Sequence, residues 1–221
     1  MCGIVGIYSE SHVASSIYES LLMLQHRGQD AAGMVVCEAE GILHSRKSMG
    51  YVRDVFRQTH MDKLMGNYGI GHVRYPTSGG AGKEFAQPMY VNSPYGISLA
   101  HNGNLTNSKS LARELFHAEM RHLNTDSDSE VLLNILAHEL GKQRAILPSK
   151  KHFFQAVRKT HVRCNGAYAV VALITGFGLL AFRDPKGIRP LVIGERQGPT
   201  RTEYIIASEN ASFSALGFNT L

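Results

Sequence analysis

The chain has 221 residues, of which 43% are hydrophobic and 19% are charged, and its formal net charge is +5 at pH 7. This length is that of one large domain or two small ones, and the composition excludes a disordered chain, a collagen-like repeat and a disulfide scaffold. No segment reaches the roughly 20 apolar residues of a membrane span, and no basic region of a secretory signal is present. The missing signal and the odd number of cysteines, three, lead us to expect a protein of the reducing cytoplasm. The missing membrane span leads us to expect no membrane partner.

The positive charge does not predict a nucleic-acid partner. The basic residues are scattered, and their densest cluster, residues 142–159, lies on and before one expected helix, which is typical of a solvated helix face. The 11 histidines include no pair with metal-ligand spacing such as His-Glu-x-x-His. We therefore expect neither a nucleic acid nor a metal ion bound to this chain.

The first half of the chain is expected to form strands interrupted by two helices. Ser11 is expected to cap the first helix, and Gly28 to end it with a left-handed turn. A Gly-rich loop from Pro76 to Lys83 separates two strands. Hydrophobic periodicity predicts strands over residues 2–9, 32–37, 42–46, 68–74 and 95–101, and helices over residues 11–28 and 52–65.

The second half is expected to form three helices followed by strands. Ser127 and Glu130 match a capping box at the start of the second of these helices. The succession of strands, helices and strands, with apolar residues on both faces of several strands, indicates stacked layers in a single domain. The expected helices cover residues 108–123, 127–140 and 150–162, and the expected strands cover residues 167–174, 179–183, 191–194 and 204–207, with a hairpin turn at 175–178.

Cys2 is a candidate nucleophile. If Met1 is removed, the thiol and a free α-amine belong to the same residue, and the neutral amine can accept the thiol proton without a histidine. The alternative is a cysteine that follows Met1 without a role, as expected of the other two: Cys37 and Cys164 lie in or beside apolar runs and are expected in the core.

Two further features fit acyl-transfer chemistry. Asn102 and Gly103 follow a strand in what is expected to be a polar turn, where an amide and a backbone N–H can point at one oxyanion. Arg74 ends a strand before the Gly-rich loop, and a guanidinium there can hold a carboxylate in two hydrogen bonds. A plain Asn-Gly turn and a surface arginine remain the structural alternatives.

Asp128 lies at the expected start of a helix, where an acidic residue is favourable without any function. Its other use is to bind an ammonium group. A nucleophile with its own base, an oxyanion site, a carboxylate site and an ammonium site together fit a substrate with an α-carboxylate, an α-amine and a side-chain amide, which is glutamine.

Eight motifs support a family resemblance. They are Met1-Cys-Gly-Ile-Val-Gly-Ile7, Leu24-Gln-His-Arg-Gly-Gln-Asp-Ala-Ala-Gly33, Gly69-Ile-Gly-His-Val-Arg-Tyr-Pro-Thr77, Gln87-Pro88, Tyr95-Gly96, His101-Asn-Gly-Asn-Leu-Thr106, Ser127-Asp-Ser-Glu130 and Phe182-Arg-Asp-Pro-Lys-Gly-Ile-Arg-Pro190. The chain resembles, along essentially its whole length, the N-terminal glutaminase domain of the amidophosphoribosyltransferase family, whose members are class II glutamine amidotransferases of purine synthesis. Glucosamine-6-phosphate synthase is the nearest alternative, but it typically reads Tyr-Arg-Gly-Tyr-Asp where this chain reads His26-Arg-Gly-Gln-Asp30.

The resemblance implies an α+β fold, a four-layer αββα sandwich of the N-terminal-nucleophile hydrolase type. It assigns the nucleophile to Cys2, which would form a glutamyl thioester, release ammonia and then be freed by water. It assigns the oxyanion hole to Asn102 and Gly103, the glutamine carboxylate to Arg74 and the glutamine amine to Asp128.

The resemblance also implies a loop that closes over glutamine, beginning at Arg74 and continuing through Thr77, with Arg27 and Gly28 lining the same site. Three cysteines are too few for the four-cysteine iron–sulfur cluster of some family members, so no cofactor is expected in this chain. Residues 1–221 are then the glutaminase domain, and the phosphoribosyltransferase domain, which would bind phosphoribosyl pyrophosphate with Mg²⁺, is expected to be absent.

Three alternatives remain open beside this interpretation. A different class II amidotransferase would have another acceptor domain, and an N-terminal-cysteine amidase would act on other amides. The amidase is disfavoured because a substrate without amino-acid ends would leave Arg74 and Asp128 unpaired. A non-catalytic binding module would keep Met1 or have an inert thiol. The resemblance also implies that the full-length protein is a homo-oligomer.

Overall fold

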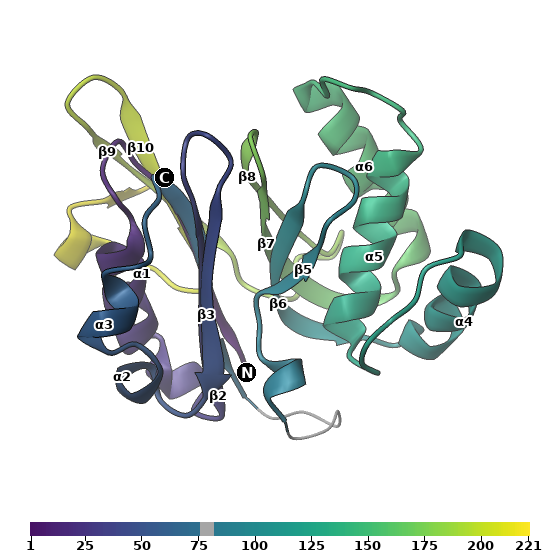
Figure 1. The fold of residues 1–221 in the computed structure, drawn as a ribbon, viewed down its shortest axis with the longest axis horizontal. Coiled ribbons are helices and arrows are strands. Elements are labelled where there is room, and N and C mark those ends of the chain that lie inside the picture. Colours follow the sequence, from purple (N-terminus) through teal and green to yellow (C-terminus); the bar gives the residue numbers. More distant parts are fainter. Residues whose placement is uncertain (76–81) are drawn as a thin grey trace.

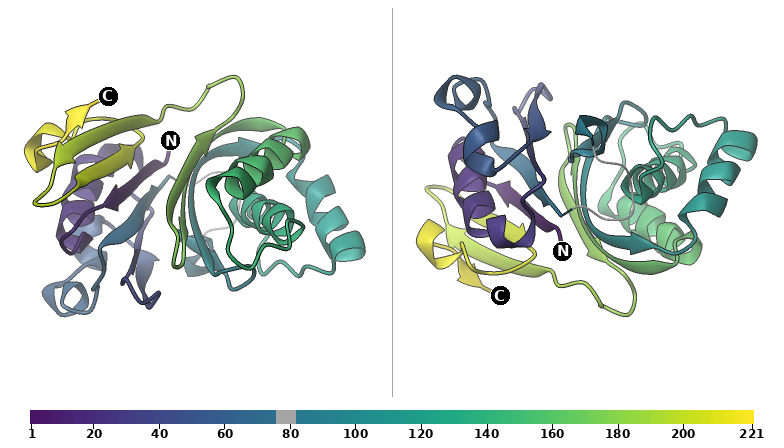
Figure 2. Two further views of the ribbon diagram at one scale, coloured as in Figure 1. Left: turned by 90° about the horizontal axis from the view of Figure 1, so that it is seen from above. Right: turned by 90° about the horizontal axis from the view of Figure 1, so that it is seen from below.

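The computed structural model describes residues 1–75 and 82–221 and arranges them in four layers (Figure 1). A seven-stranded sheet and a four-stranded sheet lie face to face, and helices cover the outer face of each, as the views from above and below show (Figure 2). The predicted α+β sandwich is confirmed. The helices are α1 (Ala14–Met23), α2 (Val52–Val55) and α3 (Gln58–Met61) on the first sheet, and α4 (Ser108–Glu119), α5 (Asp128–Gly141) and α6 (Lys150–Arg163) on the second.

Every strand pairing in the two sheets is antiparallel within the described residues. The first sheet has the order β11-β9-β10-β1-β4-β2-β3, so that β1 is a central strand, and the second has the order β5-β6-β7-β8. The strands are β1 (Gly3–Tyr8), β2 (Ala31–Cys37), β3 (Leu43–Met49), β4 (Tyr68–Arg74), β5 (Met89–Val91), β6 (Ile97–Leu105), β7 (Gly166–Ile174), β8 (Gly178–Arg183), β9 (Val192–Gln197), β10 (Thr202–Ala207) and β11 (Asn219–Thr220).

Three apolar layers hold the sandwich together. Strand β7 shows why, because its side chains alternate between two of these layers. Val171 packs between the sheets with Ile4 and Ile70, whereas Val170 packs outward with Leu132 of α5. Each such side chain contributes about 1.5–3 kcal/mol when it is fully buried. The two-faced apolar pattern seen in the sequence is therefore that of a strand in an inner layer.

The start and end of the first helix differ from the prediction. Ser11 does not cap α1, which follows Val13 without a side-chain cap, because the preceding segment is held instead by Glu203, which accepts from the Glu10 backbone N–H at 2.8 Å. Gly28 is extended, with a φ of −160°, and not left-handed. It packs so closely on β4 that a Cβ atom there would lie 2.5 Å from the Arg74 carbonyl carbon.

Two other predicted elements are corrected. The helix expected over residues 52–65 is broken into α2 and α3, because Phe56 turns into the core and Arg57 is extended. The strand expected to end at 101 continues as β6 to Leu105, because β7 pairs with these last residues. Asn102 and Gly103 therefore lie within a strand and not in a turn.

The start of α5 agrees with the sequence, but the capping box does not form. Ser127 is the N-cap residue and accepts from the Ser129 backbone N–H at 3.3 Å. Glu130 instead accepts from the backbone N–H groups of Asn124 and Thr125, both at 2.8 Å, and so holds the loop that precedes the helix. Within the described residues, no helix combines the length and apolar character that crossing a membrane requires.

Candidate active site

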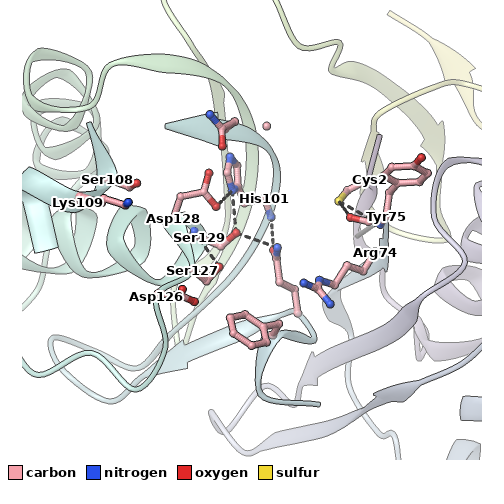
Figure 3. A pocket seen from close by; sticks show the side chains of 14 residues that line it. Cys2, Arg74, Tyr75, His101, Ser108, Lys109, Asp126, Ser127, Asp128 and Ser129 are labelled. Atoms are coloured by element: carbon pink, nitrogen blue, oxygen red, sulfur yellow. Dashed lines mark hydrogen bonds and ion pairs between the residues drawn. The ribbon is translucent and has the colours of Figure 1, made fainter. Parts of the chain in front are cut away.

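A cavity of about 180 Å³ opens where the start of β1, the end of β4 and the start of α5 meet. Figure 3 shows Cys2, Arg74 and Tyr75 on one side of this cavity, facing His101, Asp128 and Ser129 on the other. Its lining residues are Cys2, Arg74, Tyr75, Phe85, Gln87, His101, Gly103, Asn104, Ser108, Lys109, Asp126, Ser127, Asp128 and Ser129.

Cys2 directly precedes the central strand β1, which places its thiol at the end of the first sheet. The Sγ atom lies 3.5 Å from the Tyr75 backbone nitrogen, which donates to it, and 3.8 Å from the Tyr75 carbonyl oxygen. Burial raises the pKa of the Cys2 thiol, while the Tyr75 backbone, the amino terminus and the Arg74 charge act in the opposite direction. The unreacted sulfur is therefore held mainly as a thiol, and a base is needed to activate it.

Arg27 holds the backbone of Cys2 but does not line the cavity. Its Nε donates to the Cys2 carbonyl oxygen at 3.0 Å, and its Nη1 pairs with Glu209. The guanidinium is almost fully buried, with 7% of the residue exposed. Gly28 lies behind the backbone of Arg74 and is likewise outside the lining. Both residues thus support the first wall of the cavity from behind.

Arg74 presents its guanidinium to the cavity from the last position of β4. Asp30 pairs with Nη1 at 2.6 Å, and the guanidinium carbon lies 5.3 Å from the centre of the Phe85 ring. These two contacts fix the plane of the guanidinium. A planar cation of this kind matches the geometry of a carboxylate.

Asn102 and Gly103 lie side by side on β6, and only Gly103 lines the cavity. Asn102 is 2% exposed, and its amide nitrogen Nδ2 is buried with no hydrogen-bond acceptor among the described residues. Gly103 has a φ of +156°, and a Cβ atom there would lie 2.1 Å from the Ala167 carbonyl oxygen, so only glycine fits. A buried N–H donor without an acceptor costs free energy unless a bound molecule accepts a hydrogen bond from it.

Asp128 is the first residue of α5 and projects into the cavity (Figure 3). Its Oδ2 accepts from the Leu105 backbone N–H at 2.9 Å, and its Oδ1 lies 3.9 Å from His101 Nδ1. Leu105 therefore fixes the carboxylate against the end of β6, with the other oxygen beside the cavity.

Sequence reasoning missed a hydrogen-bonded group that lines the same wall. Gln87, His101 and Ser129 are buried and bonded to one another through side-chain and backbone atoms. All three belong to motifs of the family resemblance, which implies no role for them. The signal that could have found them is polar residues inside apolar surroundings, since buried polar groups need partners.

The remaining candidates are placed as follows. Thr77 lies outside the described residues, as do residues 76–81 of the Gly-rich loop. Cys37 and Cys164 are buried and free, as expected of core residues. In the part of the chain that the structure describes, no three His, Cys, Asp or Glu side chains gather as a metal centre requires.

Comparison with known proteins identifies the class to which this fold and this cavity belong. Residues 80–215, more than half of the chain, match the family model described as "Glutamine amidotransferase domain". The chain belongs to this family of glutamine amidotransferase domains.

More similar relatives bear a more particular name. The chain is 55% identical over 221 residues to amidophosphoribosyltransferase from Pseudomonas aeruginosa and 54% identical over 222 residues to that from Escherichia coli, covering 100% of this chain and 44% of each relative. The solved glutamine phosphoribosylpyrophosphate amidotransferase of Bacillus subtilis, complexed with ADP and GMP, has 33% identity and a TM-score of 0.83, again over 100% of this chain and 44% of that one. The resemblance inferred from the motifs is confirmed. The chain spans less than half the length of these relatives.

Proposed function

We propose that this chain hydrolyses the side-chain amide of L-glutamine to glutamate and ammonia through a thioester on Cys2. The observation that carries the proposal is the single cavity in which Cys2 faces Asp128, with Arg74 and Gly103 in the same lining. A nucleophile, a carboxylate, a guanidinium and a backbone donor in one cavity are the set that an amino acid with a side-chain amide requires.

In the proposed complex, the two ends of the amino acid fix its position. Arg74, oriented by Asp30 and Phe85, binds the α-carboxylate, and Asp128 Oδ1 binds the α-ammonium group. Thr77, on the loop that follows Arg74, would add a contact to the same substrate. The side-chain amide then points to the Cys2 sulfur, so that binding supplies the orientation that the reaction needs.

The proposed reaction has two steps. The Cys2 sulfur forms a bond to the amide carbon while Asn102 Nδ2 and the Gly103 N–H stabilise the oxyanion. The C–N bond then breaks, the thiol proton goes to the leaving nitrogen, and ammonia and a glutamyl thioester result. Water adds to the thioester, the C–S bond breaks, and glutamate leaves with the thiol restored. The amide nitrogen of Asn102 has no acceptor among the described residues, which supports its part in this scheme.

The base in this scheme is the α-amine of Cys2, which requires the removal of Met1. An amine with a reference pKa of about 7.7–8.0 can take the thiol proton near neutral pH. Arg27 would fix the position of Cys2 by donating to its carbonyl oxygen. Gly28 would help by supporting the Arg74 backbone from behind.

We further propose that residues 1–221 are the glutaminase domain of a longer protein that uses the ammonia to form phosphoribosylamine in purine synthesis. The names of the relatives support this and favour it over glucosamine-6-phosphate synthase. The acceptor, phosphoribosyl pyrophosphate, and its Mg²⁺ would bind in a separate phosphoribosyltransferase domain, with no cofactor on this chain. The full-length protein would be a homo-oligomer of the cytoplasm, where free thiols such as Cys37 persist.

Mass spectrometry with 6-diazo-5-oxo-L-norleucine, a glutamine analogue that alkylates nucleophiles, tests the proposal. Intact mass and peptide mapping should show loss of Met1 and one adduct, on Cys2. Cys37 and Cys164 are internal controls, because both are buried and should stay unmodified. A folded, Met1-trimmed protein that hydrolyses no glutamine and takes no adduct would refute the proposal.

A further inference from the structure

The wall of the cavity that carries Asp128 contains a hydrogen-bond chain whose proton positions the geometry determines. The His101 backbone N–H donates to Gln87 Oε1 at 2.7 Å, and because that backbone nitrogen can only donate, the oxygen of the Gln87 amide must face it. The amide nitrogen Nε2 therefore faces Ser129 Oγ and donates to it at 2.9 Å. The orientation of the amide follows from its neighbours.

This donation directs the hydroxyl of Ser129. Its Oγ already accepts from Gln87, and the other partner within reach among the described residues is His101 Nδ1, at 2.8 Å. If His101 donated instead, the buried Ser129 O–H would be left without an acceptor, at a cost of about 1–3 kcal/mol. His101 Nε2 is buried with no hydrogen-bond partner among the described residues in either tautomer, so the Ser129 hydroxyl decides between the two forms. Ser129 thus donates to Nδ1, and the proton of the neutral imidazole lies on Nε2.

The imidazole ring of His101 stays neutral at ordinary pH and does not take up a second proton. The residue is 2% exposed. Burial lowers the pKa of His101, Arg189 acts in the same direction, and Asp128 opposes it. Without a proton on Nδ1, the ring cannot donate to Asp128 Oδ1, which lies 3.9 Å away. No hydrogen bond from another described residue reaches that oxygen, whereas Oδ2 accepts from Leu105.

The segment that holds Gln87 is itself fixed by the first sheet. Lys47 on β3 donates from Nζ to the carbonyl oxygens of Ala86 and Pro88, at 2.8 and 3.1 Å, on either side of Gln87. Gln87 therefore joins the first sheet to β6 and to the start of α5, and its amide is placed by residues from three separate segments.

We propose that Gln87 is a positioning residue that, through Ser129, keeps His101 in the Nε2–H tautomer and so reserves Asp128 Oδ1 for the ammonium group of the substrate. This inference rests on the proposed function, because it assigns Asp128 to the glutamine amine. It adds that the selectivity of the site for an α-amine depends on an uncharged amide that does not itself bind the substrate's ammonium group.

Heteronuclear NMR of the imidazole nitrogens, in histidine-labelled protein, reads the tautomer directly. In the unmodified chain, Nε2 of His101 should carry the proton. In Gln87→Glu, the new carboxylate oxygen accepts from the Ser129 hydroxyl, so the proton should move to His101 Nδ1. Gln155→Glu, on the exposed face of α6, makes the same charge change far from the cavity and should leave the tautomer as it is. A proton on Nδ1 in the unmodified chain, or no change in Gln87→Glu, overturns the inference.

Ser129→Ala gives a second test that adds no charge. The variant removes the donor to Nδ1, so His101 should take the Nδ1–H form and share its proton with Asp128. The KM for L-glutamine should rise about tenfold, as expected when a charged hydrogen bond is weakened. The KM for glutaramate, which lacks the α-amine, should not change. Equal rises for both amides would count against the inference. If the unmodified chain hydrolyses neither amide, the proposed function fails, while the NMR result still decides the tautomer.

Discussion

The two walls of the cavity are built in opposite ways. On the first wall, the Cys2 sulfur contacts the Tyr75 backbone at 3.5 and 3.8 Å, and its support comes from behind, through Arg27. On the second wall, Gln87 and its partners are joined by bonds of 2.7 to 2.9 Å, and Asp128 is fixed by one of 2.9 Å. The nucleophile contacts the backbone of one residue, whereas Asp128 lies beside a hydrogen-bonded group of side chains from separate segments.

This difference matches what the two walls are proposed to do. A sulfur that must move toward a carbonyl carbon and back needs room, whereas a carboxylate that fixes a substrate gains from being oriented before the substrate arrives. Variants of Cys2 should therefore act on the rate of reaction, and variants of Asp128 on the affinity for glutamine. The expected effects below run from the largest to the smallest.

Cys2→Ala should lower the rate of ammonia release from glutamine by more than about 10³-fold, because the bond-forming atom is lost. Glutamine binding, measured by calorimetry, should persist, since Arg74 and Asp128 are untouched. If the variant still released ammonia from glutamine, Cys2 would not be the nucleophile.

Asp128→Asn should raise the KM for glutamine by about 10- to 100-fold, the effect of losing a charged hydrogen bond worth about 1.5–3 kcal/mol. The new amide oxygen can still accept from the Leu105 N–H, so the start of α5 should keep its position. Steady-state kinetics separate KM from kcat. Asp126→Asn makes the same charge change on an exposed residue of the lining, and an effect as large as that of Asp128→Asn would contradict the assignment.

Gly28→Ala should reduce the free energy of unfolding by about 1–3 kcal/mol, because the added methyl group overlaps the backbone of Arg74. Gly141→Ala is the matched control. It lies at the end of α5 with nothing within 4 Å of the new atom, so it should be neutral or stabilising by up to about 1 kcal/mol. Urea unfolding measures both, and equal losses would show that Gly28 is not closely packed.

His72→Gln should weaken the dependence of stability on pH. His72 is fully buried and donates from Nε2 to the His101 carbonyl oxygen at 3.2 Å, and burial lowers its pKa from 6.5 to about 3. Below pH 6.5 the unfolded chain binds a proton that the folded chain refuses until about pH 3, so stability is lost as the pH falls through this window.

The slope contributed by His72 should approach about 1.4 kcal/mol per pH unit. The glutamine variant can keep the hydrogen bond to His101 but does not titrate, so its free energy of unfolding should fall less between pH 6.5 and 5. His117→Gln, at an exposed position of α4, should leave the slope unchanged. Equal slopes in all three proteins would contradict the buried neutral state of His72.

Within the wall that carries Asp128, local signals in the sequence predicted one element better than the other. The start of α5, and with it the position of Asp128, follows from Ser127 and the apolar run after it. The end of β6 did not, because its ladder partners are residues 166–169, far along the chain, and the sequence around Asn102 and Gly103 alone is that of a turn. The start of α1 after Val13 escaped prediction for the same reason, since the distant Glu203 holds the segment before it.

The site residues divide in the same way. Cys2, Arg74, Gly103 and Asp128 were chosen for their chemistry, and the structure brings them to one cavity. Gln87, His101 and Ser129 were not predicted as site residues, because their hydrogen-bond chain forms only when three segments distant in the sequence meet. The sequence indicates which chemistry a residue type can perform, but only the folded structure shows which partners fix that residue's orientation.

The position of β1 has a consequence for the order in which the protein becomes active. Strand β1 is hydrogen-bonded to β10, and the Ile4 carbonyl oxygen accepts from the Ser208 backbone N–H at 3.0 Å. The residues of β1 therefore find one of their two neighbouring strands only after some two hundred further residues have been made. Until then Cys2 lacks a fixed place beside the carboxylate across from it, and a growing chain carries its thiol without a finished site.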